Sequence, residues 1–419
     1  MNNYDVIIIG GGAAGCFAAA AGEGGGRALI IEKNGVLMKK LAITGKGRCN
    51  LTNNCDAETV LGNIPRNAAF MRSALSRFSP ADTMAFFGEL GVPLKTERGG
   101  RVFPVSDKSG DVVFALEKRL RARGVEIAAD RAVSLIIENK AVKGVKCANA
   151  AYYSENVILA AGGMSYPKTG STGDGFELAR SAGHTVTPIK PALVPLVTAE
   201  DCSGAAGLTL KNVTLTLTKN GGCVFSGGEE VLFTHFGVSG PAVLSASFYV
   251  DDPKRDEYAL SIDLKPALSE KVLDARILRD FGENKNRRFK NALSGLLPQK
   301  IIALFTERSG IPPEKRVNEI TKEERKRMLS ALKNFSLSVK ATRPIDEALV
   351  TNGGVSVKEI DPKTMRSGLV KGLYFAGEVI DVAGLTGGFN LQIAFSTAYA
   401  ARTALGLMTL DFPPKNMLY

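Results

Sequence analysis

The sequence predicts an α/β protein in which one domain of alternating strands and helices is built from both ends of the chain and is interrupted by an inserted region of antiparallel strands and helices. Three observations lead to this prediction. A β-branched strand at residues 4–9 runs directly into a glycine-rich turn, and a second strand-and-glycine signature lies at residues 372–392. Between them, residues 196–264 change to alternating apolar and polar positions, as antiparallel strands do. With 45% hydrophobic and 23% charged residues among 419, the composition excludes a disordered or fibrous protein.

The first thirty residues predict a βαβ unit that binds a dinucleotide. The opening strand is followed by G-x-G-x-x-G at Gly10, Gly12 and Gly15, and then by a helix of small apolar residues. In this Rossmann motif the first glycine makes a tight turn, the second lets the backbone approach a pyrophosphate, and the third lets the helix pack closely. A second strand at residues 27–31 ends in Glu32, 22 residues after Gly10. A carboxylate at this place accepts hydrogen bonds from an adenosine ribose and disfavours the 2′-phosphate of NADP.

The C-terminal signature favours FAD over NAD as the dinucleotide. A short apolar strand at residues 372–376 is followed by Gly377-Glu378. This Gly-acid pair is typical of FAD-binding Rossmann proteins, in which the acid holds the ribityl or pyrophosphate region. Most such proteins have Asp here, so the contact is made either by Glu378 or by Asp381, three residues further on. Gly387-Gly388 then opens an Ala-rich helix, whose free N–H groups would stabilise negative charge on a reduced flavin.

A third strand end should join the other two at the cofactor. Residues 156–159 are followed by Ala160-Ala161-Gly162-Gly163. This segment is similar to the strand end that precedes the cofactor in FAD-binding Rossmann proteins. An NAD dehydrogenase would not need the C-terminal pair. No second G-x-G-x-x-G follows a strand, because the glycines of residues 170–175 have the wrong spacing. We therefore expect NAD(P)H, if it reduces the flavin, to bind transiently in the substrate cleft.

With these motifs the sequence resembles the bacterial YhiN/BaiN-like flavoproteins, a branch of the glutathione-reductase-type FAD proteins. The resemblance runs from end to end of the chain. The segments that carry it are Gly10–Gly15, Glu32-Lys33, Lys39–Asn53, Gly100–Pro104, Ser165–Pro167, Gly170–Gly175, Leu232–Pro241 and Gly377–Gln392.

The resemblance implies a Rossmann-type FAD domain with an inserted β-barrel plus helical domain. We expect residues 1–190 and 344–419 to form the FAD domain, residues 191–264 and 334–343 the barrel, and residues 265–333 the helical part. It also implies an NAD(P)H- and FAD-dependent reductase. Family members include reductases of unsaturated, bile-acid-like ketones, and some relatives resemble amine oxidases, so the resemblance does not fix the substrate. The residues that we expect to contact the cofactor are Gly10, Gly12, Ala13, Ala14, Gly15, Glu32, Lys33, Lys40, Gly45, Arg48, Cys49, Asn50, Val133, Ala161, Gly162, Gly377, Glu378, Gly387, Gly388, Asn390 and Leu391.

Residues 44–50, Thr-Gly-Lys-Gly-Arg-Cys-Asn, form a loop by composition that should pass over the cofactor. Arg48 can pair with the pyrophosphate or with a substrate anion. Cys49 can be a redox partner of the flavin or a small buried filler, and the second interpretation is favoured. Cys55, six residues on, does not have the spacing of a redox dithiol.

Two residues are candidates for moving a proton to the substrate. Tyr166, in Ser-Tyr-Pro, can donate to an enone carbonyl, and His235 can act as an acid or base near neutral pH. For both residues a structural role is the favoured interpretation. Two histidines in the whole chain exclude a multi-histidine metal site, and no metal ligands are expected. The chemistry should therefore come from the flavin, with protein groups positioning and protonating.

The six cysteines are dispersed, and no segment beyond the glycine-rich opening approaches the length of a membrane span. We expect a cytoplasmic protein with reduced thiols and no membrane partner. The formal net charge of +11 is concentrated in residues 265–345, which hold 19 Lys/Arg and 9 Asp/Glu, or +10. Solvated helix faces explain this charge most simply. Capture of an anionic substrate, steering of NAD(P)H and RNA binding are the alternatives.

Two hypotheses of different classes follow. The first is a flavoenzyme in which hydride from NAD(P)H passes through flavin N5 to an activated double bond of a small molecule, with a small-amine oxidase as its variant. The second is an RNA-modifying flavoprotein whose basic insert holds the RNA. The insert lacks regularly spaced aromatic residues and any known RNA-binding module, so the sequence favours a small-molecule substrate over nucleic acid.

Overall fold

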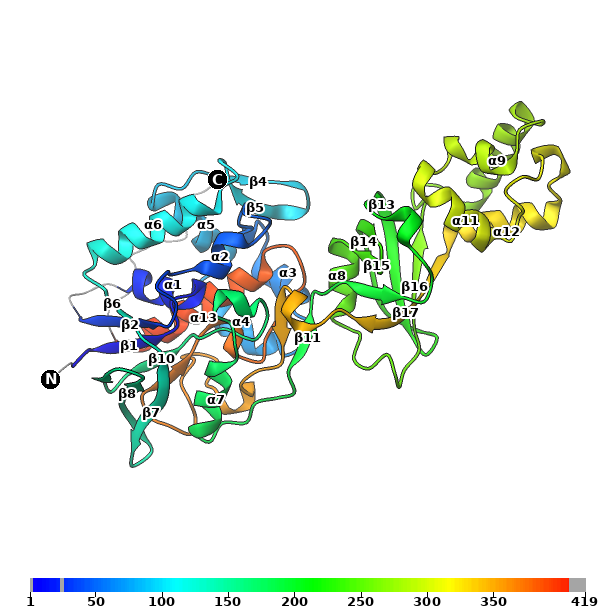
Figure 1. The fold of residues 1–419 in the computed structure, drawn as a ribbon. Coiled ribbons are helices and arrows are strands. Elements are labelled where there is room, and N and C mark those ends of the chain that lie inside the picture. Colours follow the sequence, from blue (N-terminus) through cyan, green and yellow to red (C-terminus); the bar gives the residue numbers. More distant parts are fainter. Residues whose placement is uncertain (1–2, 23–25, 407–419) are drawn as a thin grey trace. The chain divides into compact units, whose positions relative to one another are not determined.

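The computed structural model describes residues 3–22 and 26–406, and the chain divides into two compact units (Figure 1). The first unit combines residues up to 190 with residues from 349 onward, and the second is residues 191–348. The two chain ends thus share one unit.

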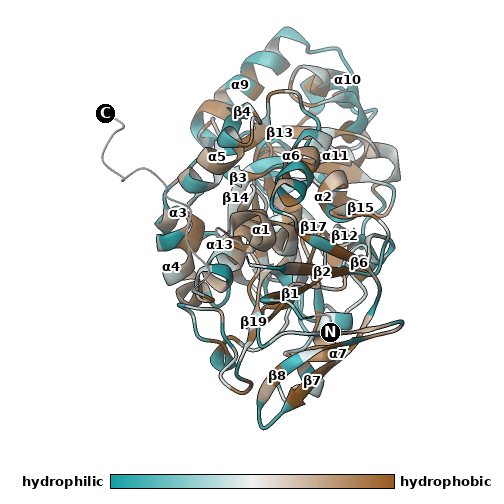
Figure 2. Cartoon of the chain, turned by 90° about the vertical axis from the view of Figure 1, so that its left-hand side faces the viewer, coloured by the Kyte–Doolittle hydropathy of each residue, from teal (hydrophilic) through white to brown (hydrophobic). Residues whose placement is uncertain are grey.

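The centre of the first unit is a five-stranded parallel sheet in the order β19-β10-β1-β2-β6. Strands β1, β2, β10 and β19 are hydrophobic and buried, as central strands of a parallel sheet are, and β1 and β2 carry the hydrophobic colour in Figure 2. The edge strand β6 is mostly exposed, with Ile127 50% exposed. In the register, Ile8 of β1 lies between Ile30 and Ile158. The strands are β1 (Val6–Ile9), β2 (Ala28–Glu32), β6 (Glu126–Ala129), β10 (Val157–Leu159) and β19 (Leu373–Phe375).

Two helices rich in small residues, one from each chain end, pack together in this unit. They are α1 (Ala13–Ala21) and α13 (Phe389–Thr403), and the rings of Phe17 and Phe395 lie 4.9 Å apart between them. Alanines along both helices permit this close approach. The remaining helices of the unit are α2 (Lys39–Ile43), α3 (Ala57–Gly62), α4 (Ala68–Arg77), α5 (Pro80–Glu89), α6 (Ser109–Ala122) and α7 (Asp174–Ser181).

Smaller sheets surround the central one. A three-stranded sheet has the order β3-β5-β4, and a β-meander has the order β7-β8-β9. Their bounds are β3 (Thr52–Asn53), β4 (Leu94–Thr96), β5 (Arg101–Pro104), β7 (Ala132–Glu138), β8 (Ala141–Cys147) and β9 (Ala151–Tyr153). Strands β11 (Lys190–Ala192) and β18 (Val350–Asn352) lie where the chain passes between the units.

The second unit contains a closed barrel in the order β12-β15-β14-β13-β16-β17. Its longest hairpin turns at Asn220-Gly221, both at positive φ, as a two-residue hairpin requires. Alternating residues point into the barrel, which matches the sequence pattern. The strands are β12 (Leu196–Thr198), β13 (Thr209–Lys219), β14 (Gly222–Thr234), β15 (Gly237–Ser239), β16 (Tyr258–Asp263) and β17 (Phe335–Thr342).

Helices interrupt and extend this barrel. Helix α8 (Pro241–Ser247) lies within the segment that the sequence pattern assigned wholly to strands. Gly240 and Pro241 explain it, because proline at the first helical position fixes a helical φ. Residues 265–333 form α9 (Glu270–Glu283), α10 (Phe289–Ala292), α11 (Ile302–Ser309) and α12 (Lys322–Lys333). In the part of the chain that the structure describes, no helix is long and apolar enough to span a bilayer.

Candidate functional site

The carboxyl ends of β1, β2, β10 and β19 meet at one edge of the parallel sheet. The Gly10 N–H donates to the Ile31 carbonyl at 2.9 Å, and the Ala160 N–H donates to the Ile9 carbonyl at 2.8 Å. The Ala376 N–H donates in turn to the Leu159 carbonyl at 3.0 Å. The structure therefore joins at this edge the strand ends that the sequence assigned separately to one cofactor. Ligands of open α/β sheets bind at such an edge.

The glycine-rich turn after β1 has the shape that a pyrophosphate needs. Gly10 has φ +105°, and a Cβ on it would lie 2.6 Å from the Ala160 carbonyl oxygen. A Cβ on Gly15 would clash with the Gly10 carbonyl oxygen. By contrast, a Cβ on Gly12 would meet nothing within 4 Å. Gly12 is the N-cap of α1 and has no side chain to cap it, so the first N–H groups of α1 face open space beside this residue.

Glu32 at the end of β2 is turned toward the glycine-rich turn. Its Oε2 accepts from the Gly11 N–H at 2.8 Å, and its Oε1 accepts from the backbone and side-chain nitrogens of Asn34, each at 2.8 Å. These three bonds leave one of the four acceptor positions of the carboxylate for a ligand hydroxyl. A pocket of about 300 Å³ opens beside it, with Leu37 and Leu120 among its apolar walls. This volume is at the small end of the range for ligand pockets.

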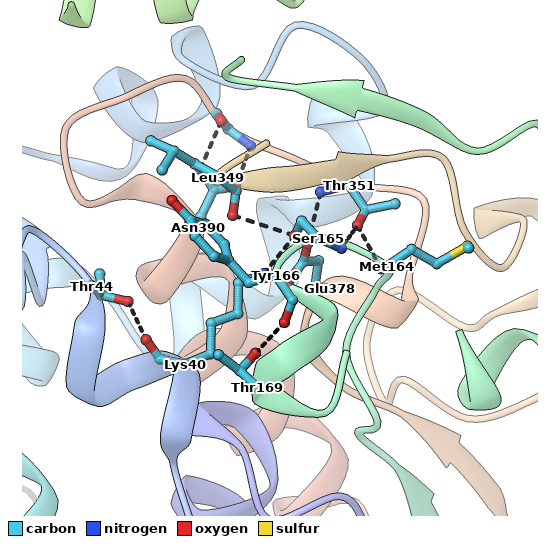
Figure 3. Close-up of polar contacts among 11 residues, drawn as sticks. Lys40, Thr44, Met164, Ser165, Tyr166, Thr169, Leu349, Thr351, Glu378 and Asn390 are labelled. Atoms are coloured by element: carbon cyan, nitrogen blue, oxygen red, sulfur yellow. Dashed lines mark hydrogen bonds and ion pairs between the residues drawn. The ribbon is translucent and has the colours of Figure 1, made fainter. Parts of the chain in front are cut away.

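Glu378 lies in a part-buried network that connects four segments of the first unit (Figure 3). Its Oε2 accepts from Lys40 Nζ at 2.8 Å, and its Oε1 accepts from the Thr351 N–H at 2.7 Å and from the Ser165 hydroxyl at 3.0 Å. Lys40 also donates to the Ser165 hydroxyl at 2.7 Å. Burial alone would raise the pKa of Glu378, but the Lys40 ammonium and these hydrogen bonds outweigh it and lower the pKa. The carboxyl is therefore ionised at neutral pH.

The two acids that the sequence proposed for the ribityl contact have different surroundings. The Asp381 side chain is 6% exposed and pairs with Arg66, and its carbonyl oxygen accepts from Asn67 at 2.7 Å. The Glu378 side chain is 21% exposed and keeps one acceptor position on Oε2. Glu378 is thus the more accessible of the two.

The N-terminus of α13 resembles that of α1. Gly387 and Gly388 have φ values of +126° and +100°, and a Cβ on Gly388 would clash with the Thr52 carbonyl oxygen. Gly388 is the N-cap and leaves the helix uncapped by a side chain. The Asn390 side chain braces the preceding loop, accepting from the Gly384 N–H at 2.9 Å and donating to its carbonyl at 2.8 Å. The two Nδ2 hydrogens of Asn390 are thus used within the loop, and its Oδ1 keeps one acceptor position.

Arg48, proposed for an anion, is already paired with carboxylates. Its guanidinium binds Glu97 and Asp107 and stacks 4.1 Å from the centre of the Phe103 ring. The hydrogen bond from Arg48 lowers the pKa of Glu97, and hydrogen bonds from Lys95 and then Arg48 lower the pKa of Asp107. The charge of Arg48 is thus compensated by two carboxylates, one in the turn between β4 and β5 and one just after β5.

The next two residues differ in what they offer a ligand. Cys49 is fully buried, and burial raises the pKa of its thiol to about 12, so the nucleophilic thiolate is scarce at neutral pH. This environment suits a small buried filler. Asn50 carries a buried side-chain oxygen that has no hydrogen-bond partner among the described residues. Such an acceptor is costly unless a ligand or water satisfies it.

The two proton-transfer candidates belong to different units. Tyr166 follows Ser165 in the first unit and has φ +53°; its carbonyl accepts from the N–H and hydroxyl of Thr169 at 2.8 and 2.7 Å. His235 is exposed in the turn between β14 and β15 of the second unit, with its ring 5.0 Å from that of Phe236. The catalytic roles of both residues stay predictions.

Lys33 and Val133 of the expected cofactor set have different surroundings. The Lys33 ammonium binds Asp174 at 2.8 Å and also the Thr172 hydroxyl, and Arg131 binds the same carboxylate at 3.1 Å. Val133 on β7 is 57% exposed. The glycine-rich segment 170–175, set aside for its spacing, thus carries the carboxylate that anchors Lys33.

Sequence reasoning missed Thr351. This residue supplies the N–H to Glu378, and its hydroxyl accepts from the Met164 N–H at 2.8 Å. No local motif marks it. The one indication in the sequence is its position, because Thr351 lies on the first strand after the insert, where the chain re-enters the nucleotide-binding unit.

Taken together, these residues fit FAD. Two uncapped helix starts, a glycine-rich turn with open space, two carboxylates with a remaining acceptor position and the unsatisfied Asn50 oxygen match an extended ligand with phosphates and hydroxyls.

Comparison with known proteins identifies the family of this chain. The family model described as the HI0933-like protein Rossmann domain matches residues 4–404. The chain belongs to this family. It is 33% identical over 385 residues to a 3-dehydro-bile acid delta(4,6)-reductase of Clostridium scindens, covering 90% of this chain and 92% of that protein. It is 32% identical over 373 residues to a ribosomal RNA dihydrouridine synthase of Haemophilus influenzae, covering 88% and 89%.

A solved structure shares the fold. The 3-ketosteroid delta1-dehydrogenase of Sterolibacterium denitrificans aligns with a TM-score of 0.50 and 14% identity, covering 97% of this chain and 99% of that one. The family and its named members confirm the predicted Rossmann-type α/β fold and the prediction of an FAD-dependent oxidoreductase.

Proposed function

We propose that this protein is an FAD-dependent reductase that saturates a carbon–carbon double bond conjugated to a carbonyl group, using hydride from transiently bound NAD(P)H. The observation that supports it most is the convergence of two uncapped helices and two carboxylates at one sheet edge. The relatives named as a bile acid delta(4,6)-reductase and a dihydrouridine synthase support the reaction class, because both names describe hydrogen added across a double bond.

The residues of the first unit would divide the work of holding the cofactor. The α1 N-terminus beside Gly12 would bind the pyrophosphate, and Glu32 would accept from the adenosine ribose. Glu378 would accept from a ribityl hydroxyl, and Lys40 keeps that carboxylate ionised and in place. Asn50 would satisfy its buried oxygen with a donor on the ligand.

Bound FAD would supply the two-electron chemistry, receiving a hydride from NAD(P)H and delivering it to the double bond. The α13 N-terminus would stabilise the negative charge that gathers on a reduced flavin ring. Tyr166 would supply the proton that completes saturation of the substrate. The products are NAD(P)⁺ and the saturated compound.

Anaerobic mixing of the purified holoenzyme with NADH or NADPH tests this proposal. We expect one of them to bleach the flavin absorbance, and an enone from a panel of enones, quinones and amines to restore it. Failure of both nicotinamides to bleach the flavin would exclude the reductase. Bleaching by an amine with oxygen consumption would instead support the oxidase variant.

A second candidate is reduction of a uridine base in RNA. The Haemophilus influenzae relative and the +10 charge of residues 265–345 favour it. The double bond reduced in uridine is also conjugated to a carbonyl, so the same cofactor site would serve both substrates. Restoration of the flavin absorbance by RNA, but by no small enone, would decide for this candidate.

A further inference from the structure

Two short segments of the helical part of the second unit pair into an antiparallel ribbon. Arg288 and Arg316 are bridge partners, and the Phe289 N–H donates to the Lys315 carbonyl at 2.8 Å. The Val317 N–H donates to the Arg287 carbonyl at 3.0 Å. The ribbon therefore consists of residues 285–290, just after α9, and residues 313–318, just before α12 (Figure 1).

The ribbon concentrates positive charge on its outer side. Its twelve residues include six Lys/Arg and one Glu, a net charge of +5. Phe289 and Val317 are buried and anchor the inner side, whereas the arginines at 287, 288 and 316 are exposed. Backbone hydrogen bonds and a buried anchor hold these cations on a defined scaffold.

The cations of the ribbon differ in how far they are compensated. Glu314 is shared between Arg288, at 2.6 Å, and Lys290, and Lys315 pairs with Glu324 at 2.7 Å. Arg287 and Arg316 form no ion pair with any described residue. Their guanidinium groups are therefore open to an external anion.

The chemistry of this surface selects the kind of partner. Arginine forks bind phosphate oxygens through two parallel hydrogen bonds. A membrane-binding surface would add exposed apolar side chains, but the apolar residues of the ribbon, Phe289 and Val317, are buried. Without exposed aromatic residues to stack on bases, the ribbon has contacts for a sugar–phosphate backbone and none for reading sequence.

We propose that this arginine ribbon binds the phosphate backbone of RNA. The inference deepens the second candidate function by assigning the surface that would hold the RNA, and it rests on that candidate. The test measures RNA binding without turnover. A failure of RNA binding can therefore be distinguished from a failure of the redox reaction.

The test measures binding of a fluorescently labelled RNA hairpin to the holoenzyme between about 50 and 200 mM salt. Each phosphate contact contributes a slope of about 0.7 to 0.9 in log K against log salt. With the smaller value, Arg287→Ala/Arg316→Ala should reduce the slope by about 1.4 and raise Kd at 0.1 M salt about 25-fold. Arg287→Lys/Arg316→Lys keeps the charge and should keep most of the slope.

A matched control removes the same charge elsewhere in this unit. Lys254→Ala/Arg255→Ala takes two exposed cations from the loop before β16 and should leave Kd within about twofold. Flavin absorbance and Tm verify that each variant is folded. Cross-linking of bound RNA to the wild-type holoenzyme, mapped by mass spectrometry, should mark peptides that contain residues 285–290 and 313–318. No binding by the wild type, an equal loss in the control, or cross-links confined to other peptides would each overturn the proposal.

Discussion

The Lys40–Glu378 ion pair should stabilise the first unit, and the structure allows the size of this effect to be calculated approximately. Lys40→Met removes two charge-assisted hydrogen bonds, at 2.7 Å to Ser165 and 2.8 Å to Glu378. Breaking a fully buried pair costs about 3–5 kcal/mol, but these side chains are 24% and 21% exposed, so solvent reduces the cost. We expect a loss of about 2 kcal/mol, or about 5 °C in Tm for a unit of this size.

The loss of stability in Lys40→Met should depend on pH, and the pKa of Glu378 determines the direction of this dependence. In the wild type the pKa of Glu378 lies below its ordinary value of 4.5, so its contribution to stability is present above that value and is lost as pH falls through the lowered pKa. Without Lys40, burial raises the pKa of Glu378. The carboxyl then takes up a proton on folding, and the cost of burying the anion disappears as pH falls. The Tm deficit of Lys40→Met should therefore be larger at about pH 7.5 than at about pH 5.

Thermal unfolding of flavin-free protein measures this effect, so that FAD affinity does not enter. Glu378→Gln and the double variant complete a cycle, and we expect a coupling free energy of about 1–2 kcal/mol. Equal Tm deficits at both pH values, or additive losses in the cycle, would show that the pair has no energetic role beyond packing.

Three further predictions concern single residues of the first unit. Glu32→Ala should purify with less FAD, and an FAD content equal to wild type would remove the ribose role. Gly12→Ala should fold with unchanged Tm when flavin-free but bind FAD more weakly, because its Cβ enters only open space; Gly15→Ala, whose Cβ clashes with Gly10, should instead lower the Tm itself. Cys49→Ser should leave flavin reduction by NAD(P)H within about twofold, since a thiol with a pKa of about 12 is a poor redox partner; a larger loss would favour the redox role.

The sequence predicted those parts of the fold and site that depend on local chemistry. Gly10, Gly15 and Glu32 are specified by a strand, a turn and a helix that follow one another directly, so their spacing alone indicates their arrangement. The Asn220-Gly221 hairpin is local in the same way. Helix α8 was missed because an alternating pattern surrounds it, and Gly-Pro is a weaker signal than a long periodic stretch.

Contacts between distant segments could not be predicted because they depend on how the elements pack. Thr351 reaches Glu378 only because β18 follows the insert back into the first unit. The backbones of Arg288 and Arg316 form a β-bridge although α11 and its flanking turns separate these residues along the chain. Composition reported the positive charge of this region correctly, but it could not distinguish Lys315, which is neutralised by Glu324, from Arg316, which forms no such pair with any described residue.

The folded insert helps to explain how Lys40 and Glu378 can form a contact although they are far apart in the sequence. These residues are 338 positions apart, and residues 191–348 between them form a unit with its own hydrophobic core. Loop-closure entropy depends on the length of flexible chain, so an independently folded insert shortens the effective loop that must close. The contact then joins the first and last parts of the nucleotide-binding unit at the edge where FAD would bind. Because FAD would contact both parts, its binding free energy would add to the stability of their association, by about 2.7 kcal/mol at a free concentration of 100 times Kd. The same residues would therefore hold the cofactor and complete the unit that binds it.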